Sequence, residues 1–149
     1  MKNKFISFYF DVASRASELS YANRLKVGAV VVKDHRILSY GYNGTPVGFD
    51  NDCELHIPEQ TGPGGTTIEK QTITKPEVIH AEQNALMKVA RSSDSTDGAV
   101  MFVTHSPCVD CAKLILQSGI KEVYYIEDYR STGGIDILRN GNVKVVKNG

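Results

Sequence analysis

Two short groups of residues in this 149-residue chain have the types and spacing of metal ligands. Cys108 and Cys111 are separated by two residues in "PCVDC", and His80 lies two residues before Glu82 in "HAE". One imidazole and two thiolates suit Zn²⁺, and three protein ligands leave a fourth tetrahedral position free for water. The two groups together therefore predict a zinc site that is open for catalysis.

Two other interpretations of the cysteines stay open at this level. A Cys-x-x-Cys pair that follows a strand and starts a helix is also typical of a thioredoxin-like redox couple. A fourth protein ligand would instead close the site and make the zinc purely structural. The candidates for that fourth ligand are Cys53, His56, His105, Asp110 and Glu82.

Glu82 is spaced to move protons beside a metal that His80 holds. Zinc lowers the pKa of a bound water towards about 7. A carboxylate that lies near the metal without binding it could take the proton from water, pass it to a ring nitrogen of the substrate, and help protonate a departing amine. The motif therefore predicts hydrolytic deamination.

The composition limits the class of protein. Seventeen basic and seventeen acidic residues cancel, so no bulk charge indicates a nucleic-acid polymer or a membrane surface as partner. No apolar run reaches the roughly 18 residues of a membrane span, and the N-terminal residues do not form a signal-peptide core. Three cysteines are too few for a secreted disulfide framework. We therefore expect a cytoplasmic protein that acts on a small molecule.

The elements that must position these residues follow the order αββαβαβαβ along a single domain, residues 1–149. A tight turn makes the first two strands antiparallel, and the later alternation of strands and helices favours parallel pairing. This pattern predicts an α/β fold, a three-layer α/β/α sandwich with a mixed sheet of about five strands. A Gly/Pro/Thr-rich stretch at about 44–76 is expected to be a long loop. Helices are expected at 5–19, 78–93, 108–119 and 134–140, and strands at 26–34, 37–43, 99–105, 121–128 and 143–148.

Five segments in this order resemble the cytidine and deoxycytidylate deaminase superfamily, most closely its deoxycytidylate (dCMP) deaminase branch. They are "KVGAVVV", "GYNGTPVG", "HAEQNAL", "SPCVDCAKLILQSGIKEVYY" and "DILRN". The resemblance covers about residues 26–140 except the central loop. It implies the cytidine deaminase fold and zinc-dependent conversion of dCMP to dUMP and ammonia, which supplies dUMP for thymidylate synthesis.

Other functions are alternatives to this one. The same chemistry could act on another cytosine nucleotide or nucleoside, including 5-substituted dCMP, on a guanine or riboflavin precursor, or on an adenosine in tRNA. The zero net charge does not support a tRNA substrate. From another class, a non-catalytic zinc protein or a thiol redox protein remains an alternative.

The resemblance also implies roles for individual residues. His80, Cys108 and Cys111 would bind one catalytic zinc, and Glu82 would shuttle protons. Six further residues are candidate substrate contacts: Asn43 at the sugar, the Ala81 N–H at the pyrimidine carbonyl, the Ser106 carbonyl at the amino group, and Tyr129, His105 and Arg91 around the nucleotide or, for Arg91, at a neighbouring subunit. Donors to the phosphate stay open among Arg24, Lys26, Lys75, Arg91, Arg130 and the Gly-rich loop.

Partners follow from the resemblance as well. The family often forms hexamers that dCTP and dTTP, with Mg²⁺, regulate, so we expect a homo-oligomer. Some members use an aromatic residue of the "HAE" helix for regulation, whereas this position is Lys88 here, and a regulator-independent enzyme is an alternative. Some relatives hold a second, structural zinc with cysteines on both sides of the "VGAV" strand. Only Cys53 is present here, so a second zinc is not expected.

Overall fold

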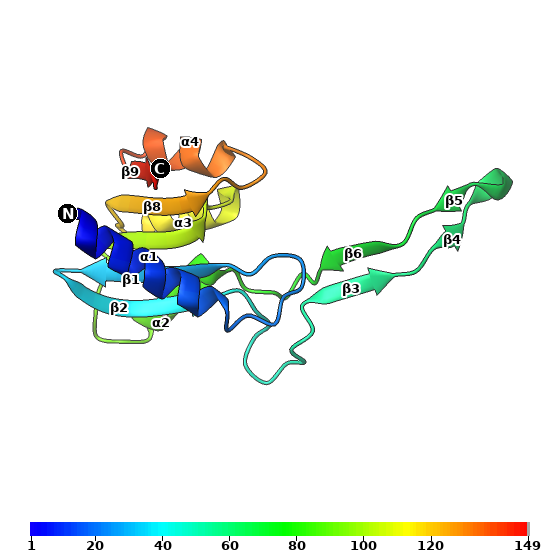
Figure 1. The fold of residues 1–149 in the computed structure, drawn as a ribbon, viewed down its shortest axis with the longest axis horizontal. Helices are drawn as coiled ribbons and strands as arrows, with labels where there is room; N and C mark the ends of the chain where they lie inside the picture. The colour runs from blue at the N-terminus through cyan, green and yellow to red at the C-terminus, as the bar shows by residue number, and fades with distance from the viewer. Residues whose placement is uncertain (149) are drawn as a thin grey trace.

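A five-stranded mixed sheet organises the computed structural model, which describes residues 1–148 (Figure 1). The strand order is β2-β1-β7-β8-β9. β1 pairs antiparallel with both β2 and β7, whereas β7, β8 and β9 are parallel, which confirms the predicted mixed sheet. The strands are β1 Gly28–Lys33, β2 Arg36–Tyr42, β7 Val100–His105, β8 Glu122–Glu127 and β9 Lys144–Lys147.

The turn between β1 and β2 fixes the antiparallel start of the sheet. Asp34 and His35 both have positive φ, at 51° and 60°. Positive φ at both central residues is the pattern of a type I′ turn, whose twist matches that of the two strands it joins. The sequence "DHR" therefore makes the hairpin that the valine-rich flanks predict.

Helices cover both faces of the sheet, which confirms the three-layer prediction. α1 (Asn3–Ser17) packs on one face, and α2 (Ala81–Ala90), α3 (Val109–Gln117) and α4 (Gly133–Asn140) pack on the other. Successive strand residues point to opposite faces, so Val30 lies in the core under α1 and Val31 lies in the core under α2. Within residues 1–148, no helix combines the length and the apolar character needed to cross a membrane.

Residues 44–76 differ from the long loop that the sequence predicts. β3 (Glu54–Ile57) pairs antiparallel with β6 (Gln71–Thr74), and β4 (Gln60–Thr61) pairs with β5 (Thr67–Ile68). Figure 1 shows this ribbon extending away from the sheet, and we call residues 54–74 the arm. The loop prediction is wrong for these strands, because "ELHI" and "QTIT" carry β-branched and apolar residues that pair across a Gly/Pro turn.

Candidate active site

His80, Cys108 and Cys111 converge where α2 and α3 begin. His80 is the N-cap residue of α2, Cys108 is the N-cap residue of α3, and Cys111 lies in the first turn of α3. The Nδ1 atom of His80 lies 3.5 Å from Cys108 Sγ and 3.3 Å from Cys111 Sγ, and all three ligand atoms lie within 4.8 Å of one another. A tetrahedral site with Zn–N of about 2.0 Å and Zn–S of about 2.3 Å separates such atoms by about 3.5 Å. The donor set therefore fits one zinc ion.

Two local contacts hold the two helix starts in place. The His80 N–H donates to Gln83 Oε1 at 2.9 Å, so the first turn of α2 fixes the backbone of its own ligand. The start of α4 packs against the turn that leads into α3. A Cβ on Gly134 would lie 2.0 Å from the Pro107 carbonyl oxygen, so this approach requires glycine.

The three ligand side chains shift one another's pKa values. A hydrogen bond from Cys111, together with His80, lowers the pKa of Cys108 to about 4. The same hydrogen bond to Cys108, with burial and the nearby Glu82 carboxyl, raises the pKa of the Cys111 thiol above its usual range. Contact with Cys108 also raises the pKa of His80. Zinc binding therefore has to displace protons from this cluster.

Glu82 is the carboxyl group of the site. It lies in the first turn of α2 and is only 4% exposed. Burial raises its pKa to about 7, because the charged form loses its hydration. A carboxyl group with this pKa can both accept and donate a proton at neutral pH, which is what general acid–base catalysis requires.

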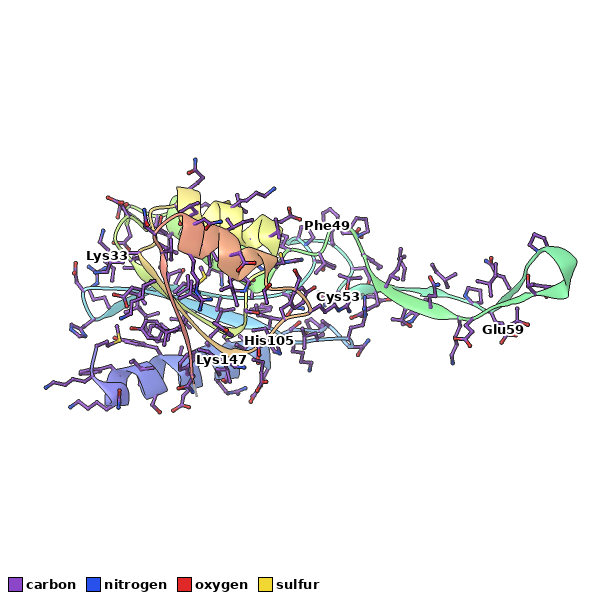
Figure 2. All side chains as sticks on the ribbon, turned by 90° about the horizontal axis from the view of Figure 1, so that it is seen from above. Lys33, Phe49, Cys53, Glu59, His105 and Lys147 are labelled. Carbon is purple, nitrogen blue, oxygen red and sulfur yellow. The ribbon has the colours of Figure 1, made fainter. Side chains whose placement is uncertain are left out.

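A cavity of about 1010 Å³ opens beside the ligands. This volume is at the upper end of the range for small-molecule sites and can hold a nucleotide. His80, Glu82 and Cys108 form part of its wall. The base of the arm, where Figure 2 places Cys53, forms another part. The remaining wall comes from the segment after α1, from the end of β2, and from the segments that follow β7 and β8: Ala22, Arg24, Leu25, Val27, Asn43, His105, Ser106, Glu127, Asp128, Tyr129 and Arg130.

The structure brings most of the predicted substrate residues to this cavity. Five of them line it: Asn43, Ala81, His105, Ser106 and Tyr129. Arg91 does not, because it is the C-cap residue of α2, at the helix end opposite His80. Among the candidate phosphate donors, Arg24 and Arg130 line the cavity, whereas Lys26 and Lys75 are not part of its wall.

Asn43 joins the end of β2 to the segment that follows α1. Its Oδ1 accepts a hydrogen bond from the Val27 N–H at 2.8 Å, and its Nδ2 donates to the Leu25 carbonyl at 2.8 Å. The Asn43 carbonyl also accepts from Ser20 Oγ at 2.6 Å. The carboxamide therefore shapes one wall of the cavity and keeps one Nδ2 proton for a ligand.

Ser106 and His105 form the wall at the end of β7. The Oγ of Ser106 accepts a hydrogen bond from the Tyr129 N–H at 2.7 Å, and its own N–H donates to the Glu127 carbonyl at 2.9 Å. These bonds fix the segment that carries Tyr129. The Nδ1 of His105 lies 3.0 Å from Thr104 Oγ1, and burial lowers the pKa of His105, so this imidazole stays neutral near pH 7.

Glu54 is a buried residue of the site that the sequence interpretation missed. It is 1% exposed, and its Oε1 accepts hydrogen bonds from the backbone N–H groups of Asn23 at 2.8 Å and Arg24 at 3.2 Å. This carboxylate ties the base of the arm to the segment that carries Arg24. In the sequence it is one acid within a Gly- and Thr-rich stretch, and no local pattern marks it as buried.

Cys53 lies apart from the metal ligands. It is buried in a small cluster with Ala22 and Val78. All three cysteines are free. Among the residues that the structure describes, one group of His, Cys, Asp and Glu side chains could hold a metal, and it consists of His80, Cys108 and Cys111. The five candidate fourth ligands are outside that group, so three protein ligands are grouped here.

Comparisons with known proteins agree with this geometry. Residues 2–127 match the family model of the cytidine and deoxycytidylate deaminase zinc-binding region. The chain is 38% identical to deoxycytidylate deaminase of Enterobacteria phage T4, over 93% of this chain and 87% of the relative. It is 37% identical to the Homo sapiens deoxycytidylate deaminase, over 81% and 64%. A crystal structure of dCMP deaminase from cyanophage S-TIM5, in complex with dCMP and dUMP, superposes with a TM-score of 0.86 at 48% identity, covering 99% of both chains.

Proposed function

Because this chain belongs to the cytidine and deoxycytidylate deaminase family, we propose that it deaminates dCMP to dUMP and ammonia. The observation that carries the proposal is the His80, Cys108 and Cys111 cluster beside the buried Glu82, on a cavity of nucleotide size. The cyanophage relative that was solved with dCMP and dUMP supports the same substrate. The product, dUMP, is the precursor for thymidylate synthesis.

The cofactor of the proposed reaction is one zinc ion per chain. His80 Nδ1 and the thiolates of Cys108 and Cys111 would hold it, since their spacing matches tetrahedral N and S ligands. Zinc, when bound, supplies the Lewis acid that activates water for attack on the ring carbon that bears the amino group. The remaining chemistry belongs to the side chains of the cavity.

Glu82 moves the protons of the reaction. It takes a proton from the attacking water and passes it to the neighbouring ring nitrogen, which neutralises the charge that develops on the ring. It then helps to protonate the exocyclic amine, which leaves as ammonia while the ring carbonyl forms. The raised pKa of Glu82, about 7, suits both directions of transfer at neutral pH.

The cavity wall supplies the contacts that orient the nucleotide. The Ala81 N–H belongs to the first turn of α2, where the helix itself provides no acceptor, so it is available to the pyrimidine carbonyl. The Ser106 carbonyl accepts from the amino group, and Asn43 contacts the sugar. Arg24 and Arg130 bind the phosphate, since these two of the candidate cations line the cavity.

Tyr129 and His105 complete the surroundings of the nucleotide. Both line the cavity, and the neutral His105 contributes a hydrogen-bonding wall without adding charge next to the zinc ligands. Arg91 lies at the other end of α2, so its proposed contact is with a neighbouring subunit and not with the phosphate bound in its own chain.

We further propose that residues 1–149 form one deaminase domain of a cytoplasmic homo-oligomer, the hexamer being the form that the resemblance implies. Three free cysteines suit a reducing compartment. Regulation by dCTP or dTTP with Mg²⁺ remains a prediction of the resemblance. Lys88 supports the regulator-independent alternative, because it occupies the position at which some members use an aromatic residue for regulation. Its Nζ lies 3.9 Å from the centroid of the Tyr40 ring and donates to the Tyr40 carbonyl at 2.8 Å.

A substrate panel tests the proposed function. Zinc-loaded protein is mixed with dCMP, 5-substituted dCMP, deoxycytidine or dCTP as substrate, and dCMP turnover is also measured with dCTP added as regulator, while the cytosine absorbance is followed. We expect turnover of dCMP, loss of nearly all activity in Glu82→Gln with zinc retained, and unchanged activity in the matched control Glu77→Gln, an exposed glutamate before the same helix. Full activity in Glu82→Gln would refute the mechanism, and preference for deoxycytidine would refute the phosphate contacts.

A further inference from the structure

The arm exposes apolar side chains that no other part of the chain covers in the described residues. Leu55 and Ile73 lie directly opposite each other on β3 and β6, and they are 43% and 40% exposed. Ile68, near the tip, is 46% exposed. Figures 1 and 2 both show the arm leaving the body from its base, and Figure 2 places Glu59 far out along it. The arm therefore presents three apolar side chains to its surroundings, Leu55, Ile68 and Ile73, which we call the stripe.

A ribbon of this kind needs a partner to stay ordered. A two-stranded hairpin alone is at best marginally stable in water, because it buries too little apolar surface to offset its loss of conformational freedom. The arm of this chain consists of two such paired segments in succession, β3 with β6 and β4 with β5. A surface that covers the stripe would supply the missing burial.

The rim of the cavity carries a second apolar surface. It consists of Leu25 and Tyr129, which line the cavity, and of three exposed residues on the chain segments that carry the wall residues Ala22, Asn43 and Cys53, namely Tyr21, Val47 and Phe49. Figure 2 places Phe49 at the base of the arm. The rim and the arm together hold eight of the sixteen large hydrophobic side chains that are exposed within residues 1–148. Exposed apolar side chains are thus concentrated at this end of the molecule, which is typical of an interaction site.

We propose that the arm of one copy of this chain docks across the cavity rim of a second copy, so that each cavity is covered by its partner. Both halves of the interface, the stripe and the rim, belong to the same chain, which is the requirement for a self-complementary interface. The covered cavity excludes bulk water from the bound base, which strengthens the electrostatic interactions inside the site. The catalytic consequence rests on the proposed function, whereas the docking does not.

The dimensions of the arm fit this role. From Glu54 to Thr61 it contains eight residues, which in extended strands reach about 26 Å. The rest of the chain has an expected radius of gyration of about 14 Å, so one arm spans most of a neighbouring body. The 21 residues of the arm, 54–74, match the 20 to 30 residues that each partner contributes to a standard interface.

Sedimentation of the zinc-loaded full chain tests the docking. The arm variant combines Leu55→Glu and Ile68→Glu, two positions outside the cavity wall. Its matched control combines Met87→Glu and Leu114→Glu, which are 53% and 42% exposed on α2 and α3. Charges placed in the centre of an interface weaken binding by at least about 30-fold each. We expect the wild type and the control to self-associate and the arm variant to associate at least about a hundredfold more weakly. A monomeric wild type, an arm variant that associates like the wild type, or an equal loss in the control would overturn the proposal.

Mixing the arm variant with Glu82→Gln tests whether the arm acts on the partner's cavity. The arm variant keeps Glu82 but lacks a functional stripe, whereas Glu82→Gln keeps the stripe but lacks the proton carrier. We expect an equal mixture to turn over dCMP several-fold faster than the sum of the two alone, because the intact arm covers the cavity that retains Glu82. A mixture no faster than that sum would overturn action in trans. If the wild type sediments as expected but turns over no dCMP, the docking stands and the proposed function fails.

Discussion

Replacing Gly134 by alanine should loosen the zinc site without touching a ligand. A Cβ at this position would lie 2.0 Å from the Pro107 carbonyl oxygen and 2.9 Å from the backbone of Cys108, whereas real Cβ atoms keep at least about 3.0 Å. Either α4 or the Pro107–Cys108 turn must therefore move by about 1 Å. Zinc sites tolerate ligand displacements of only about 0.2 Å. A shift of the turn consequently weakens metal binding.

The expected loss of stability follows from the same clash. Overpacking of this kind costs about 1–3 kcal/mol, and for a chain of this length each kcal/mol lowers Tm by about 2–4 °C. The neighbouring substitution Gly133→Ala is the matched control, because its Cβ meets two exposed side chains and no backbone: Val109 Cγ2 at 2.9 Å and Ser131 Oγ at 3.3 Å. Those side chains can rotate away, and alanine favours the helix over glycine by up to about 1 kcal/mol.

Thermal unfolding and zinc content measure both effects. The two variants and the wild type are dialysed against one fixed concentration of a zinc chelator, and zinc per chain is determined by mass spectrometry. We expect Gly134→Ala to unfold about 2–12 °C below the wild type and to retain less zinc, and Gly133→Ala to match the wild type in both. If Gly134→Ala keeps the wild-type Tm and zinc content, the close packing of α4 on the ligand turn does not position the site.

Three further predictions follow from buried groups. Zinc affinity should fall at least about tenfold for each unit that the pH drops, since the raised pKa of Cys111 means that zinc must displace its proton, and the raised pKa of His80 adds to this requirement. A competition titration at pH 6 and 8 measures the change, and equal affinities would contradict the ligand assignment. Glu54→Ala should lower the free energy of unfolding by about 2–4 kcal/mol, because it leaves the backbone N–H groups of Asn23 and Arg24 without an acceptor. The control Glu59→Ala, at an exposed position, should change it by no more than about 0.5 kcal/mol. Denaturant titration measures both. Burial raises the pKa of Glu82 from 4.5 to about 7. The contribution of Glu82 to the free energy of unfolding of the metal-free protein is therefore fully present below pH 4.5. It falls by about 3 kcal/mol as the pH rises through 7. Glu82→Gln has no such loss, so the difference in free energy of unfolding between the two metal-free proteins should grow with pH. A difference that stays constant would contradict the raised pKa of Glu82.

The group of candidate metal ligands could be predicted from the sequence because its members lie in two short contiguous motifs. His80 with Glu82, and Cys108 with Cys111, each lie within one helix start, so local spacing alone indicates their geometry. That the two helices begin side by side follows from the alternation of strands and helices. The mixed sheet and its helical layers could be predicted for the same reason, since the valine-rich and aromatic strands carry strong local patterns.

The arm and Glu54 could not be predicted, because their structure depends on pairing between distant residues. Gly62 to Gly65 dominate the composition of the central stretch and hide the four short strands around them. Glu54 is buried only because its carboxylate accepts backbone N–H groups some 30 residues earlier in the chain. Arg24 and Arg130 could not be distinguished from the other cations for a similar reason, since each reaches the cavity from a different segment.

Metal reconstitution tests the central claim most directly. Protein stripped of metal by a chelator is supplied with dCMP before and after addition of one equivalent of zinc, and dUMP and ammonia are quantified separately. We expect no turnover by the stripped protein, restored turnover with zinc that yields dUMP and ammonia in equal amounts, and no restoration in Cys108→Ser. Equal turnover with and without zinc, or none from fully zinc-loaded wild type, would contradict it.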